Sequence, residues 1–150
     1  MADKWNSKKY KQCAAKHYNA CQYIVNKYKS LPKSYKNDLI SSLYYLGGYV
    51  IECSFKCIYL ENNHDRERFY SKEELMQMCL LTHKLKPLLL QVQDSSGVEL
   101  PSWDNLSKFT QEWSENVRYD YSLVRKKHKL ILEDFWGDVQ NIYNLLRCNY

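Results

Sequence analysis

The sequence has little glycine and proline, with 4 Gly and 3 Pro among 150 residues. Sheets joined by many tight turns need more of both, so this scarcity argues against a β-sandwich or barrel and favours long helices. No apolar run approaches the roughly 20 residues that a bilayer-spanning helix needs, so we expect no membrane span. The N-terminal segment also lacks an apolar signal core, and we therefore expect a cytoplasmic protein.

Signatures of several enzyme classes are missing as well. The chain has no Gly-rich phosphate loop, no Gly-x-Ser-x-Gly elbow and no His-Glu-x-x-His. Its 6 cysteines include no Cys-x-x-Cys, and without an export signal we expect free thiols. Cys13, His17 and Cys21 recur at steps of four, as do Cys53 and Cys57, which would suit zinc. We favour cysteines buried between helices, and predict neither metal nor cofactor.

What the chain does have is the composition of one globular domain spanning residues 1–150, with 45% hydrophobic and 26% charged residues. It is rich in aromatic residues that carry a polar group, with 14 Tyr and 4 Trp. Such residues suit a helical core, a contact surface or stacking on bases. The net charge of +5 permits an anionic partner without requiring one.

Apolar residues at helical spacing predict helices along the whole chain. We expect long helices over 3–28, 34–59 and 122–146, shorter ones from Ser71, around 84–91 and over 101–113, and hence an all-α antiparallel bundle of four main helices plus short ones. The Leu31-Pro32-Lys33 connection is so short that the first two helices must be neighbours. Gly47 and Gly48 lie inside the second helix, where each costs about 1 kcal/mol relative to Ala. We expect another backbone to approach them closely.

Three segments carry a resemblance to a known family. Residues 44–56 read YYLGGYVIECSFK, residues 82–89 begin Thr-His-Lys-Leu and end Leu-Leu, and residues 113–119 read Trp-Ser-Glu-Asn-Val-Arg-Tyr. In this order they resemble segments of HEPN domains, the higher eukaryote and prokaryote nucleotide-binding family. The resemblance implies a HEPN-like bundle and a ligand cleft lined by the polar residues of these segments, with a contribution from the start of the last helix: Glu52, Lys56, His83, Arg118, Tyr119 and Arg125.

Catalytic HEPN proteins are metal-independent ribonucleases whose motif is Arg, four to six residues, then His. In such chemistry Arg stabilises the phosphorane while His moves the 2′-hydroxyl proton. Counting from Arg118, no His stands at the allowed positions, so the motif is broken. His128 follows Arg125 with two residues between them, and the pair would share one helix face. Arg118 and His128 are therefore the candidate catalytic residues.

The leading interpretation is a HEPN-like protein that binds a nucleotide or RNA. One alternative is an active endoribonuclease using Arg118 or Arg125 with His128, and another is a non-catalytic protein-interaction module. The resemblance further implies a role in a toxin-antitoxin or phage-defence system, with a nucleotidyltransferase-type antitoxin as a partner. The tyrosines, the Gly47-Gly48 pair and the family's habit of joining two motif copies predict a homodimer.

Overall fold

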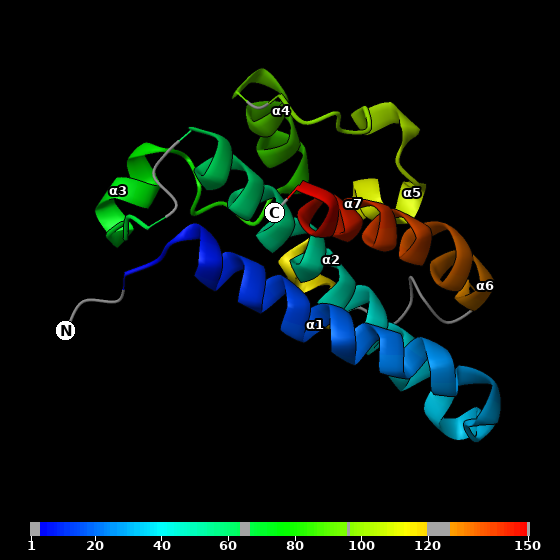
Figure 1. The fold of residues 1–150 in the computed structure, drawn as a ribbon. Coiled ribbons are helices and arrows are strands. Elements are labelled where there is room, and N and C mark those ends of the chain that lie inside the picture. Colours follow the sequence, from blue (N-terminus) through cyan, green and yellow to red (C-terminus); the bar gives the residue numbers. More distant parts are fainter. Residues whose placement is uncertain (1–3, 64–66, 96, 120–126, 150) are drawn as a thin grey trace.

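The computed structural model describes residues 4–63, 67–95, 97–119 and 127–149, and these form an all-α bundle without a β-strand among them. The predicted fold class is thus confirmed (Figure 1). In chain order the elements are α1 (Ser7–Lys27), η1 (Tyr28–Ser30), α2 (Lys33–Asn63), α3 (Lys72–Gln77), α4 (Leu85–Ser95), η2 (Trp103–Asn105), α5 (Lys108–Glu112), η3 (Glu115–Tyr119), α6 (His128–Leu130), η4 (Ile131–Phe135) and α7 (Trp136–Asn149).

A long antiparallel hairpin of α1 and α2 forms the frame, as the short connection predicted (Figure 1). The first helix begins at Ser7, later than the predicted residue 3, because Asn6 is its N-cap and accepts a hydrogen bond from the Lys9 backbone at 2.9 Å. Trp5, just before the cap, is extended and exchanges two backbone hydrogen bonds with Tyr70 at 2.9 and 2.7 Å. This isolated bridge ties the N-terminal segment to the chain entering α3.

The second helix is the central element, since α1, α4, α7 and η3 all pack against it. Its buried face includes several residues without any exposure, among them Leu43, Val50 and Cys57. At its far end lies α3, whose predicted start at Ser71 is confirmed. A capping box forms there: Ser71 Oγ accepts from Glu74 N at 3.2 Å, and Glu74 Oε1 accepts from Ser71 N at 3.3 Å. The predicted start of α4 near Lys84 is also confirmed, and Pro87 stands in its first turn.

The single helix predicted over 101–113 is wrong. The segment instead forms η2 and α5, separated by Leu106 and Ser107 in extended conformation. Ser107 caps α5 and its backbone N–H donates to Asp138 of α7 at 2.8 Å, while Gln111 donates to the Trp103 and Leu106 carbonyls at 3.1 and 2.9 Å. These side chains satisfy the backbone at the break, which is why the helix divides here.

The last helix is interrupted by a π turn rather than continuous. Within the described residues it starts at His128 as α6, passes through the π segment η4 and ends as α7. The predicted start at residue 122 lies outside the described residues. Phe135, at the end of the π turn, is fully buried against Tyr44 with ring centroids 4.8 Å apart.

The expectation that another backbone approaches the two glycines of α2 is also wrong. A Cβ at Gly48 would lie 1.8 Å from Trp113 Cε2, and a Cβ at Gly47 would lie 2.7 Å from Phe135 Cε1. Aromatic rings of the same chain therefore fill the space left by the absent side chains. The Trp113 ring is fixed there by a hydrogen bond from its Nε1 to the Tyr44 carbonyl at 3.0 Å.

Much of the tyrosine content is core rather than surface: Tyr10, Tyr18, Tyr44 and Tyr70 are all buried. Tyr18, for example, stacks on Tyr143 with ring centroids 4.1 Å apart. The homodimer stays a prediction, but the glycine pair no longer supports it and the tyrosines support it less.

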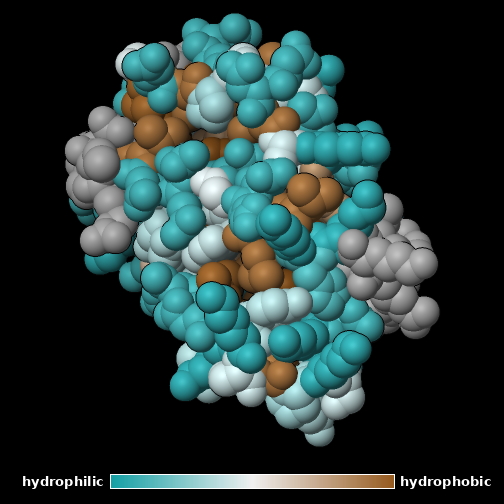
Figure 2. All heavy atoms as spheres, turned by 90° about the vertical axis from the view of Figure 1, so that its right-hand side faces the viewer, coloured by the Kyte–Doolittle hydropathy of each residue, from teal (hydrophilic) through white to brown (hydrophobic). Residues whose placement is uncertain are grey.

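Seen from the side of α6, the molecule presents a mainly hydrophilic surface with separate hydrophobic patches (Figure 2). Within the described residues, no helix combines the length and apolar character needed to cross a bilayer.

Replacing Gly48 by Ala is expected to lower the free energy of unfolding by about 2 kcal/mol or more, because the added methyl overlaps the indole of Trp113. Gly137→Ala is the matched control: nothing lies within 4 Å of its Cβ position in α7, so the better helix former should raise stability by up to about 1 kcal/mol. Urea unfolding followed by circular dichroism measures both. Equal effects of the two substitutions would contradict the packing described above.

Candidate functional site

Glu52 and Lys56 form a buried ion pair on α2. The Lys56 Nζ lies 3.2 Å from Glu52 Oε2, and each side chain is only 5% exposed. Its burial excludes a routine surface contact for this i, i+4 pair. Two desolvated charges need close, well-aligned partners, and here each charge has the other.

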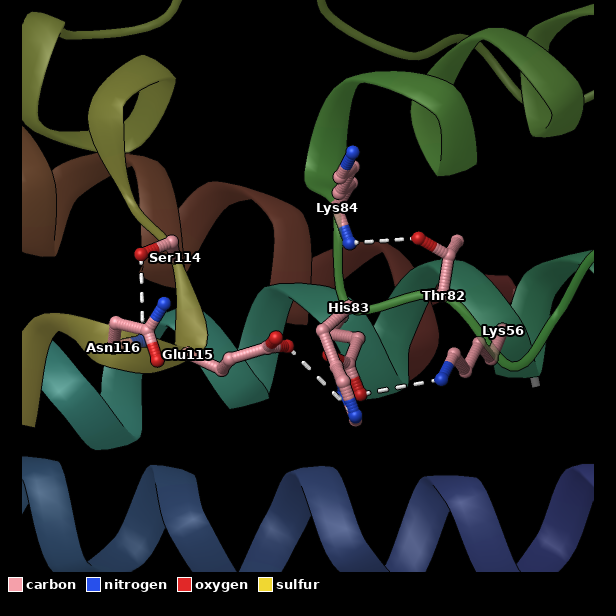
Figure 3. Close-up of polar contacts among 8 residues, drawn as sticks. Lys56, Thr82, His83, Lys84, Ser114, Glu115 and Asn116 are labelled. Atoms are coloured by element: carbon pink, nitrogen blue, oxygen red, sulfur yellow. Dashed lines mark hydrogen bonds and ion pairs between the residues drawn. The ribbon is translucent and has the colours of Figure 1, made fainter.

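His83, in the loop before α4, completes the contacts of Glu52. Its Nδ1 lies 2.8 Å from Glu52 Oε1, so each carboxylate oxygen has its own partner. The Nε2 faces Glu115 of η3, with 3.8 Å between the nitrogen and Oε2, and almost half of the imidazole side chain is exposed (Figure 3). Thr82, the preceding residue, accepts a hydrogen bond from the Lys84 backbone at 3.1 Å and fixes the loop. The result is an imidazole oriented by a buried carboxylate.

These three residues face a cavity of about 570 Å³, within the usual range for small-molecule sites. Its wall includes the rings of Trp5, Tyr10 and Tyr49 as well as Lys72 of α3. The β-bridge to Tyr70 explains how Trp5 comes to lie at this wall. The full lining is Trp5, Tyr10, Cys13, His17, Tyr49, Glu52, Cys53, Lys56, Lys72, Leu75, Leu81 and His83.

His83 also lines a second cavity of about 460 Å³, which lies against α4 and η3. Here the wall includes Trp103 and Trp113 together with Lys84 and Lys86. One histidine thus faces two hollows, each with indole and lysine side chains in its wall. An elongated ligand with rings and negative charges could contact both.

The structure brings together only some of the predicted ligand-binding residues. Glu52, Lys56 and His83 meet as expected. Arg118 and Tyr119 belong to η3, which packs against α2, but their side chains lie outside the described residues. Arg125 also lies outside the described residues.

His128, the candidate catalytic histidine, lies at the opposite end of the α1–α2 hairpin. Its Nε2 donates to Asn37 Oδ1 and its Nδ1 accepts from the Tyr28 hydroxyl, both at 2.7 Å. Burial, and secondly the charge of Lys36, lower the pKa of His128, which favours the neutral ring with Nε2 as the donor and Nδ1 as the acceptor. From Asn37 to Glu52 is fifteen residues of α2, or about 22 Å. His128 and His83 therefore belong to separate sites.

The zinc interpretation of Cys13, His17 and Cys21 is not supported. Cys21 is fully buried with its Sγ directed toward the Leu43 carbonyl at 3.9 Å, whereas Cys13 and His17 line the cavity. Across the part of the chain that the structure describes, no group of three or more His, Cys, Asp or Glu is placed to hold a metal ion. Cys21 is thus buried between two helices, as we predicted for the cysteines.

Sequence reasoning missed the α1 wall of the cavity. Tyr10, Cys13 and His17 stand at steps of three and four, so their spacing alone signalled a shared helix face. Trp5 had no such signal, because its place depends on a backbone bridge to a residue 65 positions away.

Comparisons with known proteins add no relative: a scan against protein-family models finds no match, and searches of curated proteins and solved structures find none either. The resemblance to HEPN domains therefore stays a prediction.

A double-mutant cycle is expected to show strong coupling between Glu52 and Lys56. Glu52→Gln should cost about 3–5 kcal/mol because it leaves a buried ammonium unpaired, and adding Lys56→Met should restore much of that loss. The matched control is the exposed i, i+4 pair Lys108 and Glu112, whose atoms are 3.8 Å apart and whose coupling should stay below about 0.5 kcal/mol. Urea unfolding of each variant gives the free energies. Equally small coupling in both pairs would contradict a buried charged site.

Proposed function

We propose that this protein binds a nucleotide, free or as part of an RNA strand, in the cavity beside His83. The observation that carries the proposal is the buried cluster of Glu52, Lys56 and His83 at the wall of an aromatic-lined hollow of about 570 Å³. Charges are rarely buried without a role, and their clustering in a concave site is typical of ligand binding.

The aromatic residues of the wall suit a base. Trp5 stacks on Tyr10 with ring centroids 5.1 Å apart, and Trp5 itself remains 36% exposed at the cavity. Base–aromatic stacking contributes about 1–3 kcal/mol per base and accepts every base, because each has a π-face. Trp5 is therefore the candidate stacking residue.

The charges of the wall suit a phosphate. Lys56 is balanced by Glu52, while Lys72 adds a positive charge and His17 and His83 add two imidazoles. Cationic side chains in a partly closed hollow attract anions more strongly than the same groups on a flat surface. Because His83 also lines the second cavity with Lys84 and Lys86, a ligand longer than a mononucleotide can contact both hollows. This favours an RNA strand as well as a free nucleotide.

Binding is tested by titrating labelled ATP and a short single-stranded RNA at two salt concentrations. Trp5→Ala should weaken binding about 5- to 100-fold by removing the stacking ring. Arg118→Ala should weaken it roughly 10- to 100-fold if its guanidinium holds a phosphate. His128→Ala is the control and should change nothing, since its partner Asn37 stands about 22 Å along α2 from Glu52. No saturable binding of either ligand, or equal losses in all three variants, would refute the proposal.

A second candidate function is metal-independent RNA cleavage, and one observation moves it from His128 to His83. Both ring nitrogens of His128 already have hydrogen-bond partners in the chain. In His83 the buried Glu52 holds Nδ1, and the second nitrogen is directed toward exposed Glu115 at the longer distance of 3.8 Å. A carboxylate-oriented imidazole is the usual arrangement of a general base, which here would take the proton of a ribose 2′-hydroxyl.

Cleavage of RNA in excess EDTA would test this second function. If it occurs, His83→Asn should reduce the rate at least 100-fold, because general-base catalysis contributes about 10²–10⁴. His128→Asn should leave the rate within about twofold. The reverse pattern would restore the prediction made from the sequence, and cleavage lost in neither variant would exclude both histidines.

A further inference from the structure

Two cysteines from facing helices lie in the wall of the cavity of about 570 Å³ beside His83. Cys13 of α1 is half-buried and Cys53 of α2 is almost fully buried, and both line the cavity. The α1–α2 contacts on either side of them, Lys56 with the Tyr10 ring and His17 with the Tyr49 ring, set Cys13 opposite Cys53. Neither the nucleotide proposal nor the cleavage proposal uses these thiols.

The surroundings shift the pKa values of the two thiols in opposite directions. The hydrogen bond from Cys53, followed by that from His17, lowers the pKa of Cys13 to about 4 despite partial burial. The same contact and burial hold the pKa of Cys53 well above its usual range. The other charged groups around the pair are Lys16 on α1, and Glu52 and Lys56 on α2. These shifts favour the thiolate form at Cys13 and the protonated thiol at Cys53.

The other thiols described differ from this pair. Cys21 and Cys57 are both fully buried and do not line the cavity. Burial raises the pKa of the Cys21 thiol to about 12. Cys79 is exposed just after α3, outside the cavity. A partly exposed thiol of lowered pKa that faces a second thiol in the same cavity is the arrangement typical of a redox-sensitive pair.

We propose that Cys13 and Cys53 form a reversible disulfide in the cavity wall when the protein meets a small disulfide such as oxidised glutathione. This inference does not depend on the identity of the ligand that the cavity binds.

The exchange takes two steps. The Cys13 thiolate attacks one sulfur of the small disulfide, forming a mixed disulfide at Cys13 and releasing one small thiolate. Loss of the charge on Cys13 removes one cause that kept Cys53 protonated. The Cys53 sulfur then gives up its proton and attacks Cys13 Sγ, which forms the protein disulfide and expels the second small thiolate, which takes up a proton. Two protein sulfurs are oxidised and one small disulfide is reduced to two thiols.

The test is to incubate the folded protein with oxidised glutathione, quench with acid and map the peptides by mass spectrometry. The expected result is a Cys13–Cys53 cross-linked peptide, a loss of two hydrogen atoms from the intact mass, and recovery of the starting mass with dithiothreitol. Absence of reaction, a lasting glutathione adduct on Cys13 without the cross-link, or cross-links confined to other cysteines would overturn the proposal.

Variants separate the two roles. Cys53→Ala should stop at the glutathione adduct of Cys13, whereas Cys13→Ala should leave Cys53 unmodified. Cys21→Ala is the buried control and should form the cross-link as the wild type does, and circular dichroism checks that each variant is folded.

Between pH 6 and pH 8 the rate of Cys13 alkylation by iodoacetamide should be nearly constant, because its thiolate is already formed. N-acetylcysteine, whose pKa is ordinary, should lose about tenfold in rate per pH unit on the acid side. The same decline in Cys13 would contradict the nucleophilic role.

Discussion

The close contact between Trp113 and Gly48 is the packing constraint on which the arrangement of the site depends. With no Cβ at Gly48, the indole lies directly on α2 and its Nε1 reaches the Tyr44 carbonyl at 3.0 Å. η3 begins two residues after Trp113, so the fixed position of the indole places Glu115 beside His83. Gly48 stands one helical turn before Glu52, so the same contact fixes the stretch of α2 that carries the buried carboxylate.

Buried charge is the second constraint, and it orients the polar side chains of the site. Glu52 has one oxygen directed to Lys56 and the other to His83. Removing either partner would leave a buried carboxylate oxygen without a partner. Lys56 has a further contact, with its ammonium 5.7 Å from the Tyr10 ring centroid. The pair therefore links α1, α2 and the loop before α4. We infer that the charges are retained for the site they orient, since an apolar pair of the same volume would stabilise the core as well.

Local sequence signals predicted the local structure, and contacts between distant segments account for what they missed. The start of α3 at Ser71 depends on a capping box between residues three apart, and this start was predicted from the sequence. The division between η2 and α5 depends on Asp138, about thirty residues further on, and no local pattern reveals it. The place of His128 depends on Tyr28, one hundred residues away. For the site, the resembling segments contributed Glu52, Lys56 and His83. Trp5 reaches the cavity only through its bridge to Tyr70, and His17 only because α1 packs against α2.

Charge balance connects the two proposals made for the cavity. A thiolate at Cys13 places a negative charge in the same wall as Lys56 and Lys72, where it opposes an incoming phosphate. Two unit charges 8 Å apart interact by about 2 kcal/mol at the effective dielectric constant of about 20 that suits such sites. Converting the thiolate to a neutral disulfide removes that repulsion. Taken together, the proposals therefore imply that the cavity binds anions more tightly in its disulfide form than in its reduced form. The other charged side chains of the cavity are the same in both forms.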